Sequence, residues 1–115
     1  MRLYNQAITS GAWASACRLL TRFGRTHAVS DGRAKAGSGN RGPSTCPAAL
    51  ELVVPDTGDY KRLGGARMVR VRPSPAGGRD QVVTQQFTEN RLLDTLVRPR
   101  GRRWLLVVNP YSPYL

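Results

Sequence analysis

Residues 1–25 read MRLYNQAITSGAWASACRLLTRFGR and contain four arginines but no acidic residue. On a helix with about 100° per residue, the apolar and basic side chains of this stretch separate onto opposite faces. The apolar face carries Trp13, Ala16, Cys17, Leu20 and Phe23, and the opposite face carries Arg18, Arg22 and Arg25. We therefore expect a basic amphipathic helix over residues 3–24, with Gly11 as the point where it could break and Gly24 as its C-cap.

A basic helix that contains serine but no carboxylate is typical of a mitochondrial targeting segment. We expect residues 1–25 to be an import signal that is either cleaved or retained as a packing helix. This prediction places the protein in the mitochondrion, on the matrix side of the inner membrane. The alternative is an ordinary surface helix whose arginines are solvated.

The composition predicts a basic chain with little core of its own. Its 115 residues suffice for one small domain, and 18 Lys and Arg against 7 Asp and Glu give a formal charge of +11. Such a charge favours a negative partner, which could be RNA, an anionic lipid surface or an acidic protein. With 12 glycines, 8 prolines and 7% aromatic residues, an independent core is hard to build at this length. We expect a mostly irregular or extended fold whose order comes from neighbouring molecules.

Beyond the N-terminal helix, the sequence predicts a linker and an extended docking region. Residues 26–49 are rich in Gly, Ser and Arg and lack apolar periodicity, which indicates a linker. Residues 50–115 form the docking region, with one short helix over residues 88–97 that Thr88 caps and Pro99 ends. Short strands are expected at residues 50–54, 67–72, 81–84 and 104–108.

Catalytic and metal-binding motifs do not occur in the sequence, and we expect a non-catalytic protein without a cofactor. The only histidine, His27, lies in the expected linker, and no CxxC, HExxH or GxSxG occurs. Cys17 is interpreted as a small buried apolar side chain. A Cys17–Cys46 disulfide in an oxidising intermembrane space is the alternative. No apolar run approaches 18 residues, so the sequence predicts no membrane span.

Candidate partner-binding residues are aromatic or apolar anchors and arginine clusters, because these types dominate the binding energy of interfaces. The anchors are Trp13, Leu20, Phe23, Trp104, Tyr111 and Tyr114. The first arginine cluster is Arg67, Arg70 and Arg72, and the second is Arg98, Arg100, Arg102 and Arg103. The second cluster adjoins Trp104, so it could contact phosphates while the tryptophan ring stacks on a base.

Several short motifs occur in the order found in one known family. They are Trp13-Ala14-Ser15, Gly42-Pro43-Ser44, the spaced residues Tyr60, Gly65, Arg67 and Val69, then Pro73-Ser74, Arg103-Trp104 and Pro113-Tyr114-Leu115. In these motifs, the chain resembles accessory subunit seven of the alpha subcomplex of mitochondrial NADH:ubiquinone oxidoreductase, respiratory complex I.

The resemblance implies a non-catalytic structural accessory subunit that lies extended on the matrix arm of complex I and supports its assembly. Electron transfer would then belong to neighbouring subunits, and the partners would be these subunits and, in addition, anionic lipid headgroups. The alternative function is a mitochondrial ribosomal protein whose arginine clusters bind ribosomal RNA.

Overall fold

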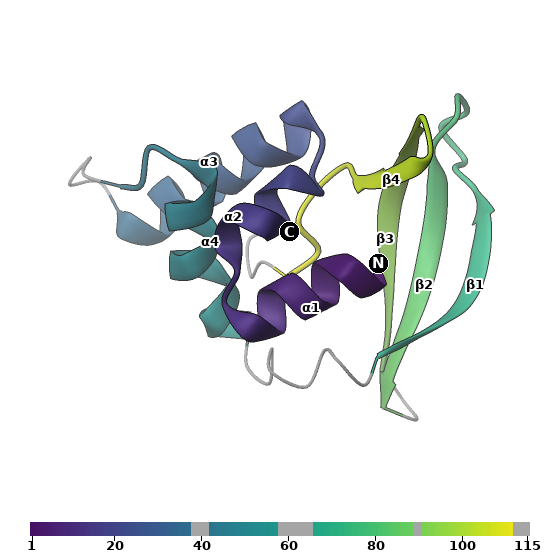
Figure 1. Ribbon diagram of the computed structural model, residues 1–115, viewed down its shortest axis with the longest axis horizontal. Helices are drawn as coiled ribbons and strands as arrows, with labels where there is room; N and C mark the ends of the chain where they lie inside the picture. The colour runs from purple at the N-terminus through teal and green to yellow at the C-terminus, as the bar shows by residue number, and fades with distance from the viewer. Residues whose placement is uncertain (38–41, 58–65, 89–90, 112–115) are drawn as a thin grey trace.

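The computed structural model describes residues 1–37, 42–57, 66–88 and 91–111, and a layer of helices packs there against one antiparallel sheet (Figure 1). The N-terminal stretch forms two short helices in place of one. Helix α1 spans Arg2–Ser10 and buries Tyr4 and Ile8, four positions apart on one face. Gly11 ends α1 in the left-handed conformation, with φ 73°, and α2 follows over Trp13–Arg18. The break at Gly11 lies where the sequence allowed it.

Helix α3 spans Arg22–Ala36 and occupies much of the stretch that we expected to be a linker over residues 26–49. The Thr21 hydroxyl caps its N-terminus by accepting a hydrogen bond from the Gly24 N–H at 3.0 Å. Gly24 is therefore an internal residue of the first turn of α3 and not a C-cap. A Cβ atom at Gly24 would lie 2.7 Å from the Val107 carbonyl oxygen, so only glycine fits where the helix crosses the C-terminal segment.

Helix α4 spans Cys46–Val53 and continues as the short 3₁₀ helix η1 over Val54–Thr57. Our expectation of a strand at residues 50–54 was wrong. Pro47 lies in the first turn of α4, where its missing N–H costs no helical hydrogen bond. Leu50 is buried on the face of α4 that meets the core, so the apolar run serves a helix here.

The sheet is an antiparallel meander in the order β1-β2-β3-β4. Its strands are β1 (Arg67–Pro73), β2 (Gln81–Thr88), β3 (Arg91–Arg100) and β4 (Arg103–Leu106). The strand predicted over residues 67–72 is confirmed as β1. The helix predicted over residues 88–97 is wrong, since β3 covers most of that range and pairs with β2 along its length.

Backbone hydrogen bonds join the helical layer to the sheet at the connection between α2 and α3. Leu20 forms a parallel bridge with Leu106 of β4, and the Thr21 N–H donates to the Leu106 carbonyl at 2.8 Å. Both leucines are almost fully buried, together with Val83 and Val97 from the inner face of the sheet. Within the described helices, none is long and apolar enough to cross a membrane.

Buried polar side chains join α1 to the sheet and to the C-terminal segment. Tyr4 of α1 donates to the Asn109 side chain at 2.7 Å, and Asn5 donates to Gln85 of β2 at 2.7 Å. The Tyr111 hydroxyl accepts a hydrogen bond from Gln85 and donates one to Asn5. These bonds satisfy polar groups that would be costly to bury alone, and they fix α1 on the inner face of the sheet.

The fold corrects our expectation of a mostly irregular chain with little core. In the described part, 43% of residues are helical and 30% are in strands, and a defined core exists. The radius of gyration of 13.8 Å is close to the value of about 13 Å expected for a compact chain of this size. The physical reason is that small residues let the helices approach closely, so a modest number of large apolar side chains suffices to fill the interior.

Candidate functional site

A pocket of about 640 Å³ lies between the start of α1, the end of α2 and the start of β4. This volume falls within the range of small-molecule sites. The lining combines arginines with apolar side chains and comprises Met1, Arg2, Leu3, Tyr4, Ala7, Ser15, Arg18, Leu19, Arg102, Arg103, Trp104 and Leu106. Three separate parts of the chain thus contribute to one site.

The four arginines of the pocket lie at the ends of secondary-structure elements, where their long side chains can reach into solvent. Arg2 is the first residue of α1 and Arg18 is the last residue of α2. Arg102 and Arg103 follow Gly101, whose φ of 62° allows the tight turn between β3 and β4. We call Arg2, Arg18, Arg102 and Arg103 the pocket arginines.

The pocket arginines are not neutralised within the described part of the chain. No described acidic side chain lines the pocket, and none forms an ion pair with these arginines. The Arg18 guanidinium donates one hydrogen bond to the Ser15 hydroxyl at 3.1 Å. All four arginine side chains are exposed, so their N–H groups can donate to a ligand without any rearrangement of the core. The site is therefore positively charged.

The apolar part of the pocket has a closed floor and exposed walls. Tyr4 and Leu106 form the floor and expose almost no surface. Trp104 lies on the same sheet face as Leu106, because alternate residues of a strand share a face. Leu3 and Trp104 stand at the mouth and expose 65% and 46% of their surface. A ligand at this site would contact apolar walls and cationic groups together.

A second group of arginines lies on the sheet outside the pocket. The Arg72 guanidinium donates to the Thr84 hydroxyl at 3.1 Å and to the Asp94 carboxylate at 2.9 Å. Hydrogen bonds from Thr84 and Arg72 lower the pKa of Asp94. Arg98 pairs with Asp80 at 2.8 Å, and this hydrogen bond lowers the pKa of Asp80. These two arginines are already held by carboxylates, in contrast to the pocket arginines.

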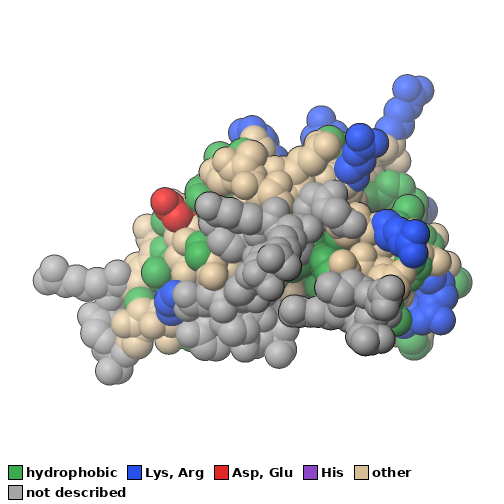
Figure 2. All heavy atoms as spheres, turned by 90° about the horizontal axis from the view of Figure 1, so that it is seen from below, with side chains coloured by type: hydrophobic (Ala, Val, Ile, Leu, Met, Phe, Trp, Pro, Cys, Tyr) green, Lys and Arg blue, Asp and Glu red, His purple; other side chains and the backbone are tan. Residues whose placement is uncertain are grey.

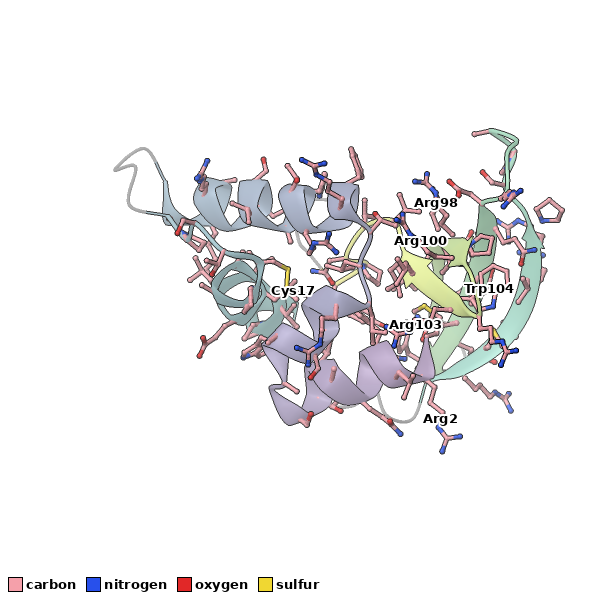
Figure 3. All side chains as sticks on the ribbon, turned by 45° about the horizontal axis from the view of Figure 1, so that its top comes forward. Arg2, Cys17, Arg98, Arg100, Arg103 and Trp104 are labelled. Carbon is pink, nitrogen blue, oxygen red and sulfur yellow. A yellow bond between two sulfur atoms is a disulfide. The ribbon has the colours of Figure 1, made fainter. Side chains whose placement is uncertain are left out.

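The structure therefore divides the two predicted arginine clusters. Arg102, Arg103 and Trp104 meet in the pocket, as neighbours in sequence and in space. Arg67, Arg70 and Arg72 lie on β1 and do not line it. Arg98 and Arg100 lie on the other side of β4 from Arg2 (Figure 3). In Figure 2, basic side chains gather toward the sheet end of the molecule, with apolar patches between them.

The predicted anchors have different environments. Leu20 and Tyr111 are buried in the chain's own core, and Trp13 is half-buried and packs against that core. These three side chains stabilise the domain itself. Phe23 is 59% exposed on α3, beside the His27 ring. Tyr114 lies outside the described residues.

Sequence reasoning missed the contribution of the N-terminal helices to the pocket. Arg18 was placed on the basic face of one long helix, and Arg2, Leu3 and Leu19 were given no role in binding. The sequence marked Gly11 only as a possible break, and the actual break there separates α1 from α2. Once the two helices are separate, the end of one and the start of the other can share a site.

Cys17 and Cys46 form a disulfide between α2 and α4, so the simpler interpretation of Cys17 as an isolated apolar side chain was wrong.

His27 lies on α3, not in a linker, with its Nδ1 atom 3.4 Å from the Asp31 carboxylate. His27 does not line the pocket. The pocket itself offers guanidinium groups and apolar surface, a combination suited to holding an anion.

No protein-family model matches this chain, and no curated protein or solved structure matches it. The resemblance to the complex I subunit therefore stays a prediction that rests on the short motifs quoted above.

Proposed function

We propose that this chain is a self-folding binding domain whose pocket between α1, α2 and β4 takes an anionic amphiphile. The ligand class is an acyl or alkyl chain that ends in a carboxylate or a phosphate. The observation that carries the proposal is the group of four pocket arginines, without a described acidic partner, around an apolar pocket.

The guanidinium group suits the proposed head group. Its planar fork of donors matches the oxygen atoms of carboxylate and phosphate, and such charge-assisted hydrogen bonds are about twice as strong as neutral ones. Arg18 and Arg103 come from different layers, α2 and β4, so an anion between them would be bound by two fixed elements. Rigid elements hold a ligand more tightly than loops do, because less entropy is lost on binding.

The walls of the pocket suit an apolar chain. Leu3, Leu19 and Trp104 offer aliphatic and aromatic surface that water now contacts in whole or in part. Covering such surface contributes about 25 cal/mol per Å² of apolar area. The head group would supply specificity through the arginines, and the chain would supply affinity through these walls.

We also propose an oxidising compartment for the folded protein, because disulfides persist there and are rare where thiols are kept reduced. The matrix location stays a prediction from the basic N-terminal segment. Tyr4, Ile8 and Leu20 of that segment are core residues, so the folded domain requires residues 1–25. Alkylation of the protein in its native source, followed by mass spectrometry, distinguishes the two locations by the state of Cys17 and Cys46.

The roles in complex I and in the mitochondrial ribosome also stay predictions. One physical argument for both roles was a chain without its own core, and the core described above removes that argument. The short motifs and the arginine clusters remain as their support. A density gradient of mitochondria solubilised in mild detergent tests both roles. Migration with NADH dehydrogenase activity would support the first role, and nuclease-sensitive migration with ribosomal RNA would support the second.

Calorimetric titration of the oxidised protein with monomeric decyl phosphate and decanoate tests the proposed function. Decyltrimethylammonium and inorganic phosphate are the comparison ligands. We expect binding of one molecule of either anionic amphiphile per chain, and much weaker binding of both comparison ligands. Equal binding of the cationic amphiphile would contradict the proposal.

Arginine variants locate the binding. The double substitution Arg18→Gln and Arg103→Gln should weaken decyl phosphate binding about tenfold or more per arginine, since each removes a charge-assisted hydrogen bond. The matched control is Arg22→Gln with Arg33→Gln, which removes the same charge from exposed positions on α3 outside the pocket. Equal weakening by the control pair would attribute binding to net charge and overturn the assignment to the pocket.

A further inference from the structure

The mouth of the pocket carries exposed apolar side chains beside its arginines. Leu3 exposes 65% of its surface and Trp104 exposes 46%, and both line the same pocket as Arg2, Arg102 and Arg103. Apolar side chains that are exposed together and bordered by polar groups mark interaction sites more often than single exposed ones do. The position of Leu3 and Trp104 beside free cationic groups restricts the chemistry of the partner.

We infer that this mouth docks on an anionic bilayer surface, so that the pocket opens directly onto the lipid layer. The inference rests on the proposed function and adds the source of the ligand. Tryptophan rings favour the boundary between headgroups and acyl chains, where the apolar ring and the polar N–H are both accommodated. Leu3 would enter the same layer from the start of α1.

Charge complementarity selects an anionic bilayer over a neutral one. The pocket arginines have no described acidic partner, whereas Arg72 and Arg98, which do not line the pocket, are paired with Asp94 and Asp80. A basic group close to an anionic lipid surface gains attraction that falls off within a Debye length. The mouth therefore combines insertion of apolar groups with attraction of cationic groups on one side of the molecule.

Docking in this orientation gives an amphiphile a short path. A chain that leaves the bilayer beside Trp104 reaches Leu19 and the pocket floor without crossing bulk water. Its head group stays among the arginines, which already contact the headgroup layer. The chemistry is shared with free amphiphiles in solution, and the experiments below separate the two sources.

Flotation of the oxidised protein with vesicles tests the docking. One vesicle set is phosphatidylcholine alone, and the other contains about one-third phosphatidylglycerol. We expect the protein to float with the anionic vesicles and to stay in solution with the neutral ones. Equal flotation with both sets, or with neither, would overturn the inference.

Substitutions at the mouth test the orientation. Leu3→Ser and Trp104→Ser should each weaken binding to anionic vesicles about tenfold, from the loss of inserted apolar surface. Phe23→Ser and Leu92→Ser are matched controls, because both side chains are 59% exposed and lie outside the pocket. Leu3 is exposed on α1, so Leu3→Ser should leave the fold intact. This variant therefore tests the orientation even if Trp104→Ser reduces stability. Equal losses in the controls would overturn the proposed orientation.

Arginine-to-glutamine variants test the contribution of charge to vesicle binding. Arg102→Gln with Arg103→Gln should weaken vesicle binding about 25-fold, which is about fivefold per arginine near the surface. Arg22→Gln with Arg33→Gln should leave it within about twofold, since charges beyond a Debye length are screened. If both pairs weaken vesicle binding equally, attraction is non-specific and the inference fails.

Two outcomes separate this inference from the proposed function. Binding of monomeric decyl phosphate without any vesicle binding would retain the pocket and overturn the membrane source. Binding of polyadenylate RNA that competes with vesicles and survives Leu3→Ser and Trp104→Ser would overturn the inference in favour of a nucleic-acid surface. Vesicle binding that fails only in the mouth variants and the Arg102 and Arg103 pair supports it.

Discussion

Cys17 of α2 and Cys46, the first residue of α4, are joined by a disulfide with their Cα atoms 6.1 Å apart. The bond closes a loop that contains the whole of α3, and the sequence separation is 29 residues. It therefore links α2, which lines the pocket, to α4, which does not. This link lets a small chain hold its helical layer together with few large apolar side chains.

Removal of the disulfide should destabilise the domain. In the loop-entropy model a cross-link over about 30 residues contributes about 3.5 kcal/mol to the free energy of unfolding. The variant with Cys17→Ser and Cys46→Ser should lose most of this amount, with a melting temperature lower by about 10–20 °C. Thermal unfolding followed by circular dichroism measures the shift. Unchanged melting, together with native protein that reacts with a thiol reagent, would contradict the disulfide.

The buried hydroxyl of Tyr111 should contribute to stability through its polar partners. Tyr111→Phe removes one hydrogen bond from Asn5 and one from Gln85, and we expect a loss of about 1–3 kcal/mol in the free energy of unfolding. Urea unfolding gives the value. Gln6→Ala is the control, because Gln6 is exposed on α1, the helix that also carries Asn5. A loss no larger than that of the control would show that the network is not formed.

Stability should fall at high pH because of the same residue. Burial raises the pKa of Tyr111 to about 12 and also raises the pKa of Tyr4 above its ordinary value. The unfolded chain releases the Tyr111 proton near pH 10 while the folded protein keeps it. The stabilisation is therefore complete below about pH 10 and is lost as pH rises toward 12. Urea unfolding across this range should show the fall, and Tyr111→Phe should reduce it. A flat profile in the native protein would contradict the burial of both rings.

Gly24→Ala should be destabilising, although alanine favours helices by roughly 0.5–1 kcal/mol over glycine. The added methyl group would lie 2.7 Å from the Val107 carbonyl oxygen, which is too close for a carbon and an oxygen atom unless the backbone shifts. We expect a net loss of about 1–3 kcal/mol. Ser30→Ala, on an exposed turn of α3, is the control. A gain in stability for Gly24→Ala would place α3 away from the C-terminal segment.

The strand β1 was predictable because valines and arginines alternate along residues 69–72 and only a strand gives that period. The strand β3 was not, because Leu92, Leu93, Leu96 and Val97 also fit the spacing of a helix face. Pairing with β2 along its length decided between the two. Local pattern alone contains no information about such a partner.

Helix α3 was missed for a related reason. Gly24 and Gly32 reduce its intrinsic helix propensity, yet both are needed where the helix meets other segments closely. The close approach of Gly32 to Pro43 and Ala49 is visible only in three dimensions.

The sequence predicted part of the candidate site, because it identified Arg102, Arg103 and Trp104 as binding residues. The residues contributed by α1 and α2 depended on the break at Gly11 and on the disulfide.

A two-dimensional ¹H–¹⁵N spectrum of the isolated oxidised chain, recorded with and without decyl phosphate, tests both the independent fold and the arginine pocket. We expect the dispersed signals of a folded monomer, with ligand-induced shifts confined to residues 2–7, 15–19 and 102–106. Signals with the narrow dispersion of an unfolded chain would contradict a domain that folds alone. Dispersed signals with shifts on β1 or α3 instead would contradict the arginine pocket as its binding site.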